Sequence, residues 1–367
     1  MSFFSSRAGI IFSGLLVGVM AVFLVIMGNP ANMGACIACF YRDAAGALGL
    51  HQAATVQYMR PEILGILLGA FITSLVVREF KPQGGSSTIL RFFIAVMVMF
   101  GALVFLGCPL RMILRLGGGD LNAFIALIGF IAGILTGIYF LKNGFTLGRA
   151  YNQSAITGSV LPFIFLVFLI LAGGAAIFLT SAEGPGSLHA PFLISLIVGL
   201  LIGFLAQKTR LCIAGGIRDA FLIRDFHLVS GFLAILIGTM VMNLIFGKFK
   251  LGFVEQPIAH TSHLWNFLGL YVVGLGSIFL GGCPLRQTVL AGQGNVDSAV
   301  TIIGFIVGAA LSHNFGIAGS PKGVGMAGQY IVVISIVLLF VIGFMNSRFG
   351  PAFNNSQKQA SIKGIGQ

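Results

Sequence analysis

Long apolar stretches alternate with short polar connections along nearly the whole chain. Ten stretches have the length that a membrane-spanning helix needs, about 17–25 residues, and few charges interrupt them. We therefore expect ten transmembrane helices, five in each half of the chain: Ala8–Gly28, Pro61–Glu79, Thr88–Gly107, Leu121–Leu141 and Val160–Thr180, then Ala190–Ala206, Val229–Gly247, Leu264–Gly282, Val296–Ser312 and Tyr330–Met345.

Two short motifs each occur twice, at nearly the same separation along the chain. Cys36-Ile-Ala-Cys39 followed by Arg42-Asp43 returns as Cys212-Ile-Ala-Gly215 followed by Arg218-Asp219, and Gly-Cys108-Pro-Leu-Arg111 returns unchanged as Gly-Cys283-Pro-Leu-Arg286. This pattern indicates an internal duplication, with a first repeat at 1–182, a second at 183–347 and a cytoplasmic tail at 348–367. Because each repeat crosses the membrane an odd number of times, we expect two inverted repeats.

Glycine and proline flank the repeated motifs, for example at Gly28-Asn29-Pro30 and Gly117-Gly118-Gly119. Such residues interrupt helices, and an interrupted backbone is tolerated at membrane depth only where it is buried in protein or lines a polar cavity. The sequence therefore predicts an all-α polytopic membrane protein whose cysteine motifs lie on re-entrant broken helices. Small-residue steps such as Gly65–Gly69, Gly129–Gly133 and Gly304–Gly308 fit closely packed membrane helices.

Composition agrees with a lipid environment. Hydrophobic residues make up 57% of the chain, charged residues 8%, and the mean hydropathy is +1.03, which excludes a soluble globular domain. The net charge of +12 comes from basic residues spread singly through loops, which favours contact with a lipid bilayer over nucleic acid.

The basic residues also predict an orientation. If both termini are cytoplasmic, the outer side keeps only seven of the 21 Lys and Arg residues, as the positive-inside rule requires. Those seven are Arg42, Arg60, Arg111, Arg115, Lys248, Lys250 and Lys322. We expect the first apolar stretch to be a retained helix and not a cleaved signal peptide.

The Cys-Pro-Leu-Arg motif suggests a binding site for an anion. Proline suits the first position of a helix, so Cys108 and Cys283 would be the N-cap residues, beside free N–H groups and partial positive charge. Arg111 and Arg286 lie one turn further on the same face. A neutral thiol there would donate a weak hydrogen bond to a soft atom such as sulfur or selenium. We expect Cys36, Cys108, Cys212 and Cys283 to be free thiols that line a substrate path.

Other residues of the motifs allow more than one interpretation. Arg42–Asp43 and Arg218–Asp219 are structural ion pairs, or their arginines exchange the carboxylate for an incoming anion. Cys39 completes a Cys-x-x-Cys spacing typical of redox or metal chemistry, but its counterpart is Gly215. His260 and His263 fit solvated loop residues.

Three function classes remain open. The first is a transporter for a small sulfur- or selenium-containing anion, with no enzymatic activity, cofactor or bound metal. The second is a membrane thiol enzyme that relays a persulfide or selenopersulfide. The third is a soft-metal carrier that uses Cys36, Cys39 and the other motif cysteines; the neighbouring arginines and Gly215, which stands in place of a second Cys-x-x-Cys, disfavour it.

The duplicated motifs resemble the YeeE/YedE family of bacterial inner-membrane transporters, and the motif at Cys212 is similar to the YedE branch linked with selenium metabolism. The resemblance implies uptake of thiosulfate or a related species, with Cys36, Cys108 and Cys283 handing it along and Cys212 as the remaining repeat-related position. It also implies a cytoplasmic sulfur-carrier partner of the TusA type.

Overall fold

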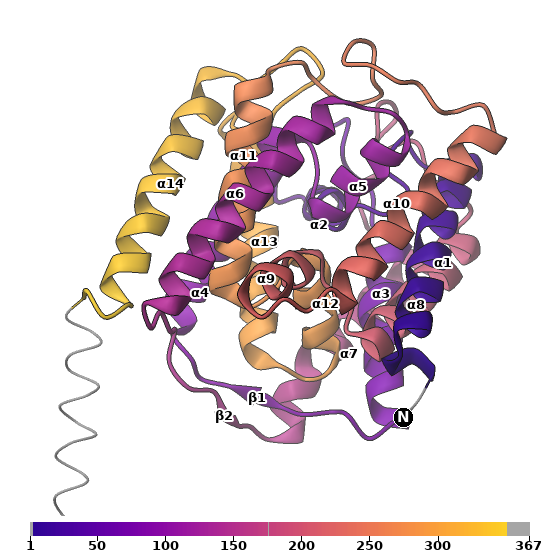
Figure 1. Ribbon diagram of the computed structural model, residues 1–367. Coiled ribbons are helices and arrows are strands. Elements are labelled where there is room, and N and C mark those ends of the chain that lie inside the picture. The colour runs from indigo at the N-terminus through magenta and orange to yellow at the C-terminus, as the bar shows by residue number, and fades with distance from the viewer. Residues whose placement is uncertain (1–2, 175, 351–367) are drawn as a thin grey trace, which may run out of the picture.

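The structure, a computed structural model, describes residues 3–174 and 176–350 and is built almost entirely of α-helices (Figure 1). The first half contains a short 3-10 helix (Phe3–Ser5), α1 (Arg7–Ile26), α2 (Ile37–Ala47), α3 (Pro61–Val76), α4 (Thr88–Phe105), α5 (Pro109–Gly117), α6 (Asn122–Lys142) and α7 (Ala155–Gly174). The second half contains α8 (Phe192–Thr209), α9 (Ile213–Leu222), α10 (His227–Ile245), α11 (His263–Leu280), α12 (Pro284–Gly292), α13 (Val296–Asn314) and α14 (Met326–Met345). This confirms the predicted fold class.

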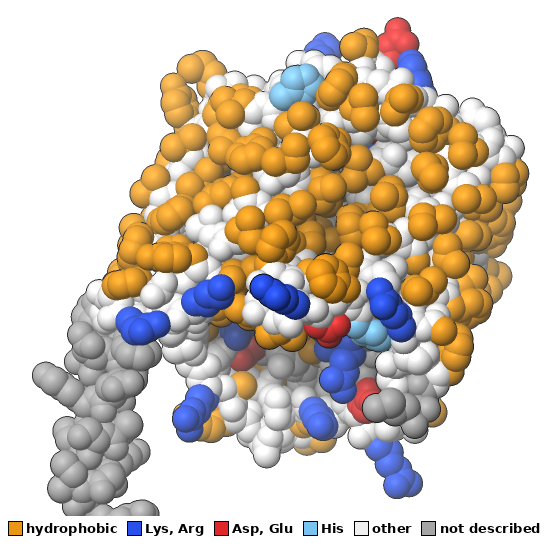
Figure 2. Space-filling model, viewed as in Figure 1, with side chains coloured by type: hydrophobic (Ala, Val, Ile, Leu, Met, Phe, Trp, Pro, Cys, Tyr) orange, Lys and Arg blue, Asp and Glu red, His pale blue; other side chains and the backbone are white. Residues whose placement is uncertain are grey.

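Each predicted span overlaps one apolar helix. Within the described residues, nine helical segments are long and apolar enough to cross a membrane, and α3 is a shorter apolar helix of 16 residues. Apolar side chains cover the middle of the visible surface in Figure 2, as a multi-pass membrane protein requires. The predicted tail lies outside the described residues from position 351 onward.

One predicted span is displaced. Helix α7 begins at Ala155 instead of Val160 and ends at Gly174 instead of Thr180. It begins early because Ser154 Oγ accepts a hydrogen bond from the Thr157 N–H (3.2 Å), which caps the first turn. It ends early at two consecutive glycines, which are poor helix formers.

The short helices α2, α5, α9 and α12 carry the cysteine motifs and lie among the long helices (Figure 1). They have 11, 9, 10 and 9 residues, so at about 1.5 Å per residue none of them is long enough to cross a bilayer. The prediction that the motifs lie on broken helices is therefore confirmed.

The connections form two layers at opposite ends of the long helices. One layer, which we call the α5 face, joins the loops after α1, α2, α7 and α10; Asn29 Oδ1 accepts from Ala190 N (2.8 Å), and Gly118 O accepts from Lys250 N (2.9 Å). The other, which we call the α12 face, holds the paired strands β1 (Gln83–Gly84) and β2 (Tyr151–Asn152) and a bond from Lys81 N to Gln293 O (2.9 Å).

The two halves are interleaved instead of forming separate units. Helix α1 packs on α10, α3 on α8, α4 on α13 and α6 on α11, so that each of these pairs joins one half to the other. Exchanging the halves converts these pairs into one another. Helix α1 ends at the α5 face, where α8 begins. The boundary at 182/183 stays a prediction.

Glycines allow these helix pairs to approach closely. A Cβ on Gly133 of α6 would lie 2.2 Å from the Tyr271 carbonyl oxygen of α11, and one on Gly69 of α3 would lie 2.3 Å from the Leu200 carbonyl oxygen of α8. A Cβ on Gly308 of α13 would meet the backbone of Val96 in α4. The small-residue steps of the sequence are thus helix–helix contacts.

His260 differs from the prediction of a solvated loop residue. Its side chain is buried, and Nε2 lies 2.8 Å from the Val104 carbonyl oxygen. This contact ties the loop between α10 and α11 to the end of α4, because the α4 carbonyl needs a partner where its helix stops.

Replacing Gly133 with alanine should separate α6 from α11, because the new methyl group meets backbone atoms that cannot rotate away. We expect a loss of about 1–3 kcal/mol in stability, measured as a lower thermal unfolding midpoint in detergent. Gly174→Ala is the matched control, since a Cβ there meets open space. Equal midpoints for the two variants would contradict this packing.

Candidate functional site

Each of the four motif cysteines is the N-cap residue of a short helix. Cys108 and Cys283 precede α5 and α12, with proline at the first helical position, as the sequence predicts. Cys36 and Cys212 precede α2 and α9. Sequence reasoning missed this second pair, because no proline follows them. The structure therefore presents four helix N-termini, each with a sulfur atom beside the first N–H groups.

On the α12 face, two of these sulfur atoms meet. Cys212 Sγ lies 3.8 Å from Cys283 Sγ, and both cysteines are free and buried. The Gly215 N–H donates to Cys212 Sγ (3.2 Å). Helix N-termini from two different segments thus converge on one pair of thiols, which places soft donors and partial positive charge together.

Arg286 stands one turn beyond this thiol pair. Its Nη1 is buried and has no hydrogen-bond partner among the described residues. The arginine lines a cavity of about 170 Å³ together with Glu79, Lys81, Gln83, Arg210, Leu290, Gln293 and Asn295. Three cationic side chains and one carboxylate therefore surround the cavity, which favours an anion.

On the α5 face, the cysteines are arranged differently. Cys36 and Cys39 form a disulfide, with their Cα atoms 5.2 Å apart, while Cys108 is a free buried thiol. The prediction that Cys36 is a free thiol is wrong in this structure. The reason is local, because residues three apart at a helix start face each other, and Cys39 occupies the position that Gly215 holds in the second half.

Arg111 is fully buried, and its donors point to backbone oxygens. Nε donates to Asn32 O (3.1 Å), Nη1 to Leu106 O, and Nη2 to Ile258 O (3.3 Å). Nη1 also lies 3.5 Å from Cys39 Sγ. Arg111 and Arg286 occupy the same place in the duplicated motif. The Arg111 guanidinium has acceptors for its donors, whereas Arg286 Nη1 has no partner among the described residues.

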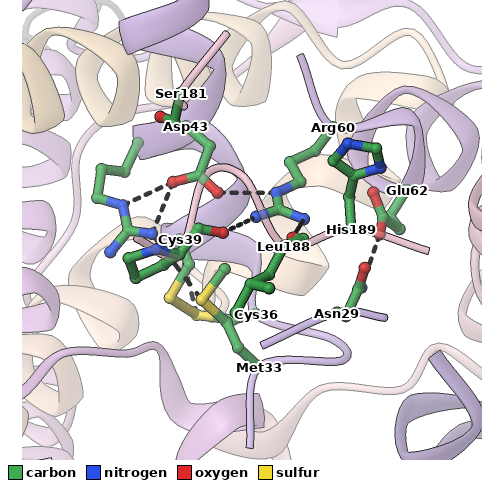
Figure 3. Close-up of polar contacts among 12 residues, drawn as sticks. Asn29, Met33, Cys36, Cys39, Asp43, Arg60, Glu62, Ser181, Leu188 and His189 are labelled. Carbon is green, nitrogen blue, oxygen red and sulfur yellow. Dashed lines mark hydrogen bonds and ion pairs between the residues drawn. A yellow bond between two sulfur atoms is a disulfide. The ribbon is translucent and has the colours of Figure 1, made fainter. Parts of the chain in front are cut away.

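The predicted ion pairs are formed. Arg42 Nη2 lies 2.6 Å from Asp43 Oδ1, and Asp43 Oδ2 accepts from Arg60 Nε (2.8 Å), so that one carboxylate joins two buried arginines. In Figure 3, Asp43 points toward Arg60 in this network. Arg218 and Asp219 form the corresponding pair (2.8 Å), which is partly exposed.

A hydrogen bond between two side chains connects the motif helices of the α5 face with those of the α12 face. Tyr41 Oη of α2 lies 2.9 Å from Thr288 Oγ1 of α12, and both residues are buried. The helix that begins at Cys36 therefore contacts the helix that begins at Cys283. The free thiols at Cys108, Cys212 and Cys283 lie on helices of this central group.

Sequence reasoning missed several residues of the site. Lys81, Arg210 and Glu79 line the cavity beside Arg286, and Arg60 shares Asp43 with Arg42. All four lie outside the repeated motifs, in loops or at helix ends, so no spacing signals them. Among them, only the basic character of Lys81 and Arg210 could have indicated a cavity that attracts an anion.

Parts of the chain are similar to a family and to two proteins that are named for transport of sulfur compounds. Residues 208–347 match a family described as sulphur transport. The thiosulfate transporter TsuA of Escherichia coli is 30% identical over 123 residues, which cover 33% of this chain and 34% of that protein. TsuA of Spirochaeta thermophila is 30% identical over 99 residues, 27% of this chain and 29% of that protein.

The matched segments span about a third of the length of these relatives. The region matched by the family contains Cys212, Cys283 and Arg286, and with them the thiol pair on the α12 face. Residues 208–347 thus match the sulphur transport family, which agrees with the resemblance that the duplicated cysteine motifs predict.

Proposed function

We propose that this protein carries a small sulfur-containing anion, thiosulfate or a close chemical relative, across a bacterial inner membrane. The observation that carries the proposal is the α12-face site, in which two N-cap thiols lie 3.8 Å apart beside an arginine with a free donor. The names of the relatives support transport over an enzyme.

The charges of the site attract an anion. Arg286, Arg210 and Lys81 line the cavity against the single carboxylate of Glu79. Oxyanion groups accept charge-assisted hydrogen bonds from a guanidinium, and these are roughly twice as strong as neutral ones. The N-termini of α9 and α12 add partial positive charge. An oxyanion is thus expected to settle between Arg286 and these helix ends.

The thiols select for a soft atom. Sulfate and phosphate present only hard oxygens, which N–H donors satisfy without any cysteine. The outer sulfur of a thiosulfate-like anion is large and polarisable, and it matches a weak S–H donor. Selenium in the same position would be softer still, so a selenium-containing anion is a substrate of the same class.

Transfer through the protein requires no covalent step. The anion would pass between free thiols by exchanging one weak hydrogen bond for another, and α2 and α12 already touch through Tyr41 and Thr288. A thiol enzyme that forms a persulfide stays the alternative, and the two cysteine pairs are the observation in its favour. Uptake of labelled substrate without chemical change separates transport from that reaction.

We place the α12 face in the cytoplasm. Lys and Arg side chains gather below the apolar belt in Figure 2, toward β1 and β2 of Figure 1, and positive loops favour the inner side. With α1 and α8 running in opposite directions, the halves then form an inverted repeat with both termini inside. A sulfur-carrier protein of the TusA type would receive the anion at the cavity of Arg286.

Replacing Cys283 with alanine should lower thiosulfate uptake into proteoliposomes roughly 10- to 100-fold, the value of a lost hydrogen bond to a charged group. Serine should restore little, because its hydroxyl is a hard donor. Yield and unfolding midpoint should stay close to those of the parent, which separates lost transport from lost folding. Normal uptake by Cys283→Ala would refute the proposal.

Replacing Arg286 with glutamine should raise the half-saturating thiosulfate concentration by roughly tenfold, because a charge-assisted bond is lost. Arg286→Lys keeps the charge without the planar guanidinium, so its half-saturating concentration should lie between those of the parent and Arg286→Gln. Lys142→Gln, a basic residue on the same face outside the cavity, is the matched control and should leave half-saturation unchanged. If Arg286→Gln behaves like that control, the arginine does not bind the anion.

Cysteines placed at two exposed positions test the orientation. Lys322 lies in the loop after α13, which is on the α5 face because Asn314 at the end of α13 donates to Leu50 O (2.9 Å) in the loop after α2. Lys142 lies at the α12-face end of α6. We expect an impermeant maleimide to label Lys322→Cys in intact cells and Lys142→Cys only after the inner membrane is opened. The opposite pattern would reverse the proposed orientation.

A further inference from the structure

The three residues whose backbone oxygens bind Arg111 share an unusual backbone conformation. Within residues 3–174 and 176–350, seven non-glycine residues have positive φ, and Asn32 (56°), Leu106 (66°) and Ile258 (48°) are three of them. These are the three residues whose carbonyl groups accept from the Arg111 guanidinium. Leucine and β-branched isoleucine are unfavourable in this region, because Cβ approaches the carbonyl oxygen.

The three turns come from different parts of the chain. Asn32 follows α1, Leu106 ends α4, and Ile258 lies in the loop between α10 and α11. Arg111 therefore holds three separate loops together at one point of the α5 face, and two of them are strained, at Leu106 and Ile258. Strain of this kind persists only where the surroundings enforce it, and the four donor contacts of Arg111, including the one to Cys39 Sγ, provide that force.

The point where the loops meet covers a cysteine of the path. Cys108 lies between Leu106 and Arg111 in the sequence and is 1% exposed. Its counterpart Cys283 lies between Gly281 and Arg286. Gly281 also has positive φ (84°), but glycine adopts it without strain. Arg286 lines a cavity, and its buried Nη1 has no hydrogen-bond partner among the described residues. Cys283 is also 1% exposed, so the two faces differ at the arginine: the Arg111 guanidinium is enclosed by acceptors, whereas Arg286 lines a cavity.

We propose that Arg111 is the latch of a gate on the α5 face, and that an incoming anion releases it; this rests on the proposed transport function. No carboxylate of the described residues forms an ion pair with Arg111, so its charge is held only by neutral acceptors. An oxyanion binds a guanidinium more strongly than carbonyl groups do. When the guanidinium turns to the anion, the three turns lose their partner and relax, and Cys108 becomes accessible.

The test measures access to Cys108 in the full-length protein in membrane vesicles. An impermeant maleimide is applied from the α5 face, and peptide mass spectrometry reads the alkylation of Cys108 and Cys283 separately. Arg111→Lys should speed alkylation of Cys108 roughly tenfold, because an ammonium group cannot span three carbonyl groups. Alkylation of Cys283 from the α12 face should not change.

A second variant acts in the opposite direction and keeps every contact of Arg111. Ile258→Gly removes the strain of the closed turn, so the gate should stay closed longer and alkylation of Cys108 should slow by roughly 5- to 10-fold. Arg78→Gly is the matched control, since Arg78 also has positive φ (56°) but lies at the α12-face end of α3. It should leave the rate for Cys108 unchanged.

An unchanged rate in both Arg111→Lys and Ile258→Gly, or faster alkylation in Ile258→Gly, would overturn the latch. These rates do not depend on uptake. If Cys283→Ala transports normally while Arg111→Lys exposes Cys108, the proposed substrate path is wrong and the latch stands. If uptake fails in Cys283→Ala but Cys108 is equally protected in all variants, the path stands and the latch is wrong.

Discussion

Interrupting a helix at membrane depth leaves backbone groups that lipid cannot satisfy, and this constraint determines where the charged residues lie. Helix α4 stops just before Cys108, and the carbonyl oxygens of Phe105 and Leu106 accept from Arg115 (2.9 Å) and Arg111. Helix α11 stops just before Cys283, and the Leu280 oxygen accepts from Arg91 (3.2 Å) and Gln287 (2.9 Å). Side chains thus satisfy the backbone at the ends of α4 and α11, the helices that precede the two Cys-Pro motifs.

The helices that follow, α5 and α12, begin at an N-cap cysteine. Proline removes one N–H donor at the first position of α5 and α12, and the remaining donors face the same space as the N-cap thiol. The donors that would normally be covered are therefore available to an anion. The broken helices leave backbone carbonyl groups unsatisfied at membrane depth, a cost that the arginines offset. The same breaks create the binding site at the helix N-termini.

The sequence predicted the parts of this arrangement that depend on local patterns. Hydrophobic length identified the nine long helices of the described residues and the shorter α3. Cys-Pro identified two of the four N-caps, because proline has one preferred place at a helix start. The remaining features depend on contacts between distant segments. No spacing places Lys81 and Arg210 beside Arg286, and nothing in the order of residues joins Asn32, Leu106 and Ile258 to one guanidinium.

The difference between the two faces follows from two positions at which the repeats diverge. Gly215 of the second half corresponds to Cys39, and Gly281 corresponds to Leu106. With glycine at both positions, Cys212 keeps a free thiol 3.8 Å from Cys283, and the turn before α12 carries no strain. With side chains at both, Cys39 binds Cys36, and Leu106 enters a strained turn held by Arg111. The same duplicated motif therefore carries an enclosed arginine on the α5 face and an arginine that lines a cavity on the α12 face, because the two repeats differ at the positions that shape the surrounding backbone.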